Sequence, residues 1–131
     1  MKIGFVGLGK LGLPVALTVE SKGHEVVGYD VSENVKNIIE AKKIPYKEIW
    51  AQDYLDKSNI KFESLENVVN HSEIIFVPIQ TPHDPLYEGV TRIPNKRVDF
   101  DYTHLKSGIK DLSNAIEKKK KDIVVIIIST V

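Results

Sequence analysis

The most informative absence in this sequence is cysteine. None of the 131 residues is a cysteine, which excludes disulfide bonds, cysteine-ligated metals and a cysteine nucleophile within these residues. An excess charge of one sign is also lacking, because 18 Lys and Arg side chains balance 18 Asp and Glu side chains. No overall field therefore favours a nucleic acid or a membrane surface as a partner, and we expect neither.

Long hydrophobic runs are missing as well. No segment approaches the length of about 18 apolar residues that a membrane span needs, and glycines interrupt the apolar start at Ile3, unlike in a signal peptide. We therefore expect a cytoplasmic location. The length and the 42% hydrophobic content predict one globular domain over residues 1–131.

The first stretch of the chain combines a short apolar run with closely spaced glycines. Lys2–Val6 leads directly into Gly7, Gly9 and Gly12, and helical spacing follows. This order predicts a strand, a tight turn and a helix start, where free N–H groups and the helix dipole favour the pyrophosphate of a dinucleotide. Gly7 permits the turn, Gly9 lacks a Cβ that would keep phosphates away, and Gly12 lets the helix approach the strand.

A lone Gly-x-Gly-x-x-Gly motif is weak evidence, so a second feature is needed. The predicted second strand begins at Glu25 and ends on Asp30, 18 residues after Gly12. At this distance a carboxylate can accept hydrogen bonds from the adenosine ribose, and it would repel a 2′-phosphate, which favours NAD over NADP. Asp30 could also cap the helix that follows Ser32, and the two roles are compatible.

The remaining elements alternate between helix and strand. The first helix places Leu11, Val15, Ala16, Leu17 and Val19 on one apolar face. Further helices are predicted after Ser32, from Ser64 to Asn70, and from a cap at Asp101 or Thr103 to about Lys121. The segment 44–59 is expected to contain turns and a short helix. Strands are predicted at Ile60–Phe62, Ile74–Ile79 and Ile123–Ile128.

Ile74–Ile79, ended by Pro78, and Ile123–Ile128 are continuous apolar runs, typical of strands buried on both faces. The pattern predicts an α/β, Rossmann-type three-layer fold with a mainly parallel sheet in the order 3-2-1-4-5. A further crossover is expected after the fifth strand, so we interpret the chain as a fragment of a longer enzyme.

Several polar and aromatic groups leave alternatives open. His83 and Asp84 would need a third ligand to hold a metal, and none is visible nearby, so we expect an exposed loop histidine and no metal site. Trp50, Tyr46 and Tyr54 form either a stacking surface or aromatic packing. Lys118–Lys121 either contacts phosphate or ends a helix in solvent, and we favour the second reading.

Together these motifs resemble those of one enzyme family. They are Gly7–Pro14, Gly28–Asp30, Pro45–Glu48, Val77–Pro78 with Thr81–Pro82, Asp99–Asp101 before a helix, and Ser129–Val131. In this order they resemble the N-terminal NAD-binding domain of the UDP-glucose/GDP-mannose dehydrogenase family, the nucleotide-sugar 6-dehydrogenases. The resemblance covers essentially the whole chain.

The resemblance implies an oxidoreductase that uses NAD twice and turns the C6 hydroxyl of a nucleotide sugar into a carboxylate. It implies that Gly7, Gly9 and Gly12, with the amides of Lys10 and Leu11, bind the pyrophosphate and that Asp30 binds the ribose. It also implies that Thr81 lines the cofactor cleft and that Thr130 has a catalytic role near the reacting carbon. Thr81 could instead serve only the turn, and Thr130 only the strand.

The family also has parts that these residues lack. Its cysteine nucleophile, its lysine and asparagine partners and its sugar-binding domain would follow Val131, so we expect the chain to bind NAD without turnover. The resemblance implies a nucleotide-sugar substrate and a homodimer or higher oligomer for the longer enzyme. The segment 80–100 is longer than the family's usual connection, which leaves the sugar open.

Two alternative functions remain. One is the cofactor domain of a β-hydroxyacid dehydrogenase, whose opening glycine motif is similar and which transfers one hydride with the help of a lysine. Asp30 and Ser129–Val131 argue against it. The other is a non-catalytic dinucleotide-binding module, against which the missing crossover argues.

Overall fold

A single parallel sheet forms the centre of the molecule. A computed structural model describes residues 1–87, 89, 92, 95–120 and 122–129. Within them lie the strands β1 (Lys2–Val6), β2 (Glu25–Tyr29), β3 (Lys61–Phe62), β4 (Ile74–Val77) and β5 (Val124–Ile127). Their order is β3-β2-β1-β4-β5, and every neighbouring pair is parallel. The predicted order and the end of β4 before Pro78 are confirmed.

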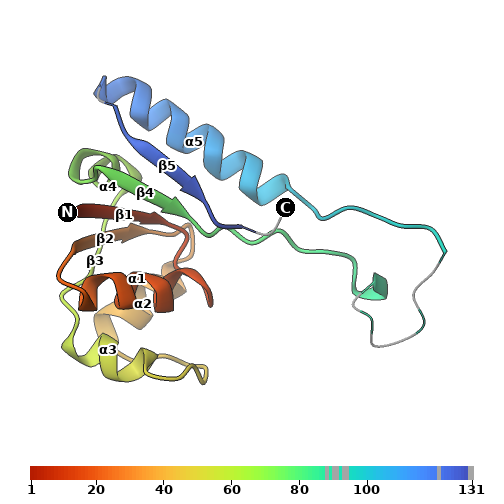
Figure 1. Cartoon of the computed structure of the whole chain (residues 1–131), viewed down its shortest axis with the longest axis horizontal. Helices are drawn as coiled ribbons and strands as arrows, with labels where there is room; N and C mark the ends of the chain where they lie inside the picture. Colours follow the sequence, from red (N-terminus) through yellow and green to blue (C-terminus); the bar gives the residue numbers. More distant parts are fainter. Residues whose placement is uncertain (88, 90–91, 93–94, 121, 130–131) are drawn as a thin grey trace.

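Helices cover both faces of this sheet, as Figure 1 shows. They are α1 (Gly12–Ser21), α2 (Glu33–Ala41), α3 (Ala51–Lys57), α4 (Leu65–His71) and α5 (Thr103–Lys119), with a short 3-10 helix at Pro85–Tyr87. The helices α1, α2 and α3 pack on one face, and α4 and α5 pack on the other. This three-layer arrangement is the predicted Rossmann-type fold. In the described part of the chain, no helix has the length and apolarity to cross a membrane.

The two apolar cores arise from the alternation of side chains along β1. Phe5 belongs to the core under α1, together with Leu17, whereas the next residue, Val6, belongs to the core under α4 and α5. Phe5 also stacks on Phe76 of β4 at a ring-centroid distance of 5.2 Å. The burial of a side chain such as Phe5 stabilises the fold by about 1.5–3 kcal/mol.

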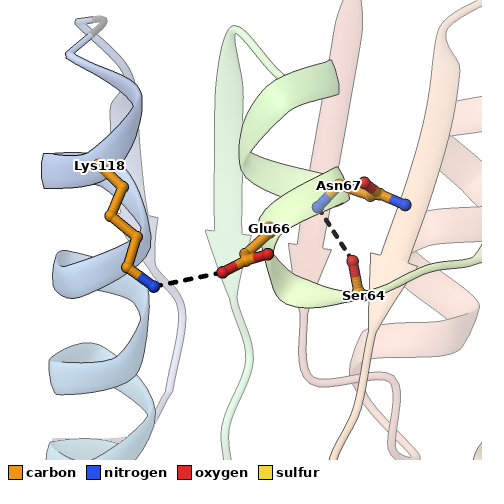
Figure 2. A network of polar contacts seen from close by, with 4 residues as sticks. All are labelled: Ser64, Glu66, Asn67 and Lys118. Carbon is orange, nitrogen blue, oxygen red and sulfur yellow. Dashed lines mark hydrogen bonds and ion pairs between the residues drawn. The ribbon is translucent and has the colours of Figure 1, made fainter.

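Polar contacts cap α4 and link it to the neighbouring α5 (Figure 2). The backbone N–H of Asn67 donates to Ser64 Oγ at 3.2 Å and caps the helix that the sequence predicts here. Glu66 pairs with Lys118 of α5 at 3.3 Å. Both side chains of this pair are exposed, so the pair contributes at most about 1 kcal/mol. Lys118 and Lys119 thus contact α4, since Lys119 Nζ also donates to the carbonyl of Val69. Lys121 of the predicted lysine run lies outside the described residues.

Two burial predictions are wrong. Val124 and Ile127 of β5 are 57% and 49% exposed, although the run was expected to be covered on both faces. The reason is that β5 is the last strand of the sheet and pairs with β4 on one side. Leu11, expected on the apolar face of α1, is 51% exposed because it occupies the N-cap position before the first buried turn.

The segment 44–59 contains the short helix that the sequence predicts, and its aromatic residues have different surroundings. Tyr54 packs against the core under α1, as the packing interpretation expects, but Trp50 is 67% exposed. Trp50 also has a left-handed backbone with φ +68° directly before α3. Burial raises the pKa of the Tyr46 hydroxyl, and the nearby Glu48 adds to this effect.

The connection between β4 and α5 extends away from the sheet (Figure 1). Its base is closed by a hydrogen bond of 2.7 Å from the N–H of Asp101 to the carbonyl of Pro82. Asp101 also accepts from the N–H of Thr103, the first residue of α5, at 2.9 Å. The N-cap position itself belongs to Tyr102, which makes no side-chain cap bond. The predicted capping by Asp101 is therefore supported, from the position before the N-cap.

Candidate functional site

Gly7 turns the chain at the carboxyl end of β1. Its φ of +108° lies in a region that side chains with a Cβ rarely adopt. Its N–H donates to the carbonyl of Tyr29 at 2.8 Å, which ties the turn to the end of β2. A Cβ at this position would also lie 3.3 Å from the carbonyl carbon and oxygen of Pro78. The turn is therefore enclosed by the ends of β2 and β4.

Gly12 allows α1 to begin directly against this turn. A Cβ on Gly12 would lie 2.1 Å from Gly7 O and 2.8 Å from Pro78 Cγ, which is closer than real Cβ contacts. Gly9 is different, because no atom lies within 4 Å of its Cβ position. The turn thus combines a close contact at Gly12 with open space at Gly9, the combination that a bound pyrophosphate requires.

The first helical hydrogen bonds begin just after this open space. The N–H of Leu13 donates to Gly9 O at 3.0 Å, and the N–H of Val15 donates to Leu11 O at 3.3 Å. The amides of Lys10 and Leu11 precede these bonds, at the end of α1 where the helix dipole is positive. Lys10 and Leu11 are exposed, so their backbone is accessible to an anion.

Asp30 follows β2 and contacts the glycine turn directly. Its Oδ2 accepts from the N–H of Leu8 at 2.7 Å, and its Oδ1 accepts from the N–H of Ser32 at 2.9 Å. The capping interpretation is therefore supported, while the hydroxyl of Ser32 makes no cap bond. Each carboxylate oxygen can accept a second hydrogen bond, so ribose hydroxyls can still donate to Asp30.

Leu8 and Pro78 support the site and were not identified from the sequence. Leu8 is 1% exposed and lies so close to β2 that a Cβ on Gly28 would be 2.5 Å from Leu8 Cδ1. Pro78 contacts the positions of both Gly7 and Gly12. Gly28 in the middle of a strand pattern was the available signal, because such a glycine marks the close approach of another residue.

The other predicted site residues are placed as follows. Thr81 is 9% exposed and lies three residues after Pro78, near the carboxyl ends of the strands. Thr130 lies outside the described residues. The His83 ring packs edge-on against Phe100 at 5.8 Å. In the described ranges, no group of three His, Asp or Glu side chains could hold a metal ion.

A separate cavity of about 790 Å³ lies at the opposite end of β2. Its lining includes Glu25 at the start of β2 and Asn70 and His71 at the end of α4. In open α/β sheets, ligands bind beyond the carboxyl ends of the strands. The glycine turn meets this condition and the cavity does not, so the glycine turn is the candidate site.

The fold and the site together define a dinucleotide-binding domain of the Rossmann type. A glycine turn after β1 opens onto the start of α1, and the acid at the end of β2 lies beside it.

The chain belongs to the UDP-glucose/GDP-mannose dehydrogenase family. The sequence model of the NAD binding domain of this family matches residues 1–131. NAD is therefore the indicated cofactor, and the resemblance found in the sequence is confirmed.

Individual relatives agree with this assignment. The chain is 26% identical to GDP-mannose 6-dehydrogenase from Pseudomonas aeruginosa across its full length, and spans 29% of that protein. It is 30% identical to UDP-N-acetyl-D-mannosamine dehydrogenase from Pyrococcus horikoshii over 90 residues, which cover 63% of the chain and 21% of that protein. The crystal structure of a ternary complex of the Pseudomonas aeruginosa GDP-mannose dehydrogenase superimposes with a TM-score of 0.84, at 26% identity and 100% coverage of this chain.

Proposed function

We propose that this chain is the NAD-binding part of a nucleotide-sugar 6-dehydrogenase. Such an enzyme oxidises the C6 hydroxyl of a UDP- or GDP-sugar to a carboxylate with two molecules of NAD. The observation that carries the proposal is the glycine turn beside Asp30, in a chain that matches the family along its whole length. The chain spans 29% of its Pseudomonas aeruginosa relative, and the sugar-binding and cysteine chemistry of such an enzyme would be supplied outside these 131 residues.

The geometry of the turn supports the binding roles that we propose. The pyrophosphate would occupy the open space at Gly9, with the amides of Lys10 and Leu11 as donors. Asp30 would accept from the ribose hydroxyls, and Thr81 would line the cleft near the end of β4. Thr130 stays a prediction, tested by Thr130→Ala in the longer enzyme, where unchanged turnover would reject its role.

Calorimetric titration with NAD and NADP tests the cofactor assignment. We expect NAD to bind more tightly, because the Asp30 carboxylate would lie beside the 2′-phosphate of NADP. Tighter binding of NADP would contradict the proposed position of the ribose.

A second experiment tests whether these 131 residues can catalyse the oxidation by themselves. The 131-residue chain, mixed with NAD and either GDP-mannose or UDP-glucose, should form no NADH, measured by absorbance. Formation of NADH would show that the catalytic groups lie within these residues. The homodimeric or higher assembly and the cytoplasmic location of the longer enzyme stay predictions.

A further inference from the structure

Asp30 is placed to do more than bind a ribose. Its Oδ2 holds the N–H of Leu8 at 2.7 Å, across 22 residues of sequence. A hydrogen bond from an amide to an ionised carboxylate is about twice as strong as one between neutral groups. The carboxylate therefore fixes the peptide group that joins Gly7 to Leu8.

Neighbouring contacts fix the same part of the turn. The N–H of Gly7 donates to Tyr29 O at 2.8 Å, and the Leu8 side chain packs against Gly28. Three consecutive residues at the end of β2 thus hold two consecutive residues of the turn. Of the two hydrogen bonds from the end of β2 to the turn, that of Asp30 lies nearer to Gly9 along the chain. The amides assigned to the pyrophosphate follow directly after it.

We propose that Asp30 is a positioning residue for the pyrophosphate site, in addition to its ribose contact; this rests on the proposed NAD-binding function. The carboxylate orients the Leu8 peptide and, through it, the amides of Gly9 and Lys10. One side chain therefore controls both the discrimination against a 2′-phosphate and the shape of the turn. Removing the carboxylate weakens the binding of any pyrophosphate ligand rather than converting the site to NADP.

The positioning role and a simple charge effect predict opposite results. If Asp30 acts only through its negative charge, its removal makes the site more favourable for an anion. If Asp30 orients the turn, its removal weakens anion binding, because the amides are no longer fixed in place. Inorganic pyrophosphate distinguishes these cases, since it contains no ribose.

The test compares the unchanged chain with Asp30→Ala, Asp30→Asn and the control Glu33→Gln. Glu33 is an exposed carboxylate in the first turn of α2, so the control removes a nearby charge and leaves the turn intact. NMR titration of the Gly9 and Lys10 amides with inorganic pyrophosphate measures affinity. We expect Asp30→Ala to weaken binding at least about tenfold, the change that 1.4 kcal/mol produces, and Glu33→Gln to leave it equal or slightly tighter.

Asp30→Asn keeps one acceptor oxygen for the two amides, so we expect an intermediate loss from this variant. Pyrophosphate binding by Asp30→Ala that equals or exceeds that of the unchanged chain would overturn the proposal.

Hydrogen exchange without ligand separates this proposal from the proposed function. The Leu8 amide should be protected in the unchanged chain and in Glu33→Gln, and should exchange at least about tenfold faster in Asp30→Ala. Equal protection in Asp30→Ala would overturn the positioning role even if NAD binds. Failure of the unchanged chain to bind NAD would overturn the proposed function, whatever the exchange at Leu8.

Discussion

Gly9 and Gly12 of the turn provide a sharp test, because the structure gives them opposite surroundings. In Gly12→Ala the new methyl group would lie 2.1 Å from Gly7 O, whereas ordinary contacts begin at 3.4 Å. The start of α1 must therefore move by about 1.3 Å. The obstacle is backbone, which cannot rotate away, so we expect a loss near the upper end of the range for overpacking, about 3 kcal/mol in the free energy of unfolding.

Gly9→Ala is the matched substitution. No atom lies within 4 Å of its Cβ position, and its φ is not positive, so we expect the free energy of unfolding to change by no more than about 0.5 kcal/mol. Its methyl group would nevertheless enter the space assigned to the pyrophosphate. We therefore expect NAD affinity to fall at least about tenfold, a loss of about 1.4 kcal/mol in binding free energy.

Urea unfolding and calorimetric titration with NAD, applied to both variants and the unchanged chain, measure the two effects. Gly12→Ala should lose stability and, because a displacement of about 1 Å can cost a factor of 100, most of its NAD affinity. Gly9→Ala should lose affinity alone. Normal NAD binding by Gly9→Ala would refute the position of the pyrophosphate, and normal stability of Gly12→Ala would refute the close contact of α1 with the turn.

Three further predictions concern the rest of the fold. A Cβ on Gly108 would lie 2.3 Å from Ile79 Cδ1. In urea unfolding, we expect Gly108→Ala to raise the free energy of unfolding of the Ile79→Val variant, which lacks that atom, by about 1 kcal/mol, and to leave that of the unchanged chain no higher. Lys120→Gly should gain about 0.5–1 kcal/mol, because Lys120 ends α5 with a left-handed backbone of φ +51°; lower stability would contradict this. The hydroxyl of Tyr102, followed by the N–H of Phe100, lowers the pKa of Asp99, so Tyr102→Phe should raise that pKa toward its ordinary value in an NMR titration. The unchanged chain should then lose more stability than Tyr102→Phe as the pH falls below the ordinary pKa of an aspartate, since a lowered pKa stabilises the fold above that pH.

The topology was predictable because it depends on local patterns. Short apolar runs alternating with periodic helices permit few arrangements, and parallel strands with right-handed crossovers reduce these further. Burial at the boundaries was not predictable in the same way. The apolar run of β5 has the composition of a central strand but the position of an edge strand. Leu11 fits the apolar periodicity of α1 but lies at the N-cap, before the helix begins.

The left-handed backbone of Trp50 shows a further limit. Nothing in its local sequence distinguishes it from an ordinary helix start, and a bulky residue with positive φ is contrary to the usual preference. Its conformation is set by the place where α3 begins, with the N–H of Tyr54 donating to Trp50 O at 3.0 Å. Positions of this kind depend on how two elements meet, which residue type alone does not encode.

In the candidate site, too, some features follow from local sequence patterns and others depend on how the elements meet. The groups assigned to the cofactor lie in short motifs, so their spacing along the chain was enough to identify them. The groups that hold these motifs come from the ends of three strands, and they meet only because β1 lies between β2 and β4. Asp30 belongs to both sets, since the carboxylate that identifies the ribose site from the sequence also bonds to Leu8 in the structure. A change of cofactor specificity in this chain therefore requires a residue that removes the negative charge but still offers an acceptor to the Leu8 amide.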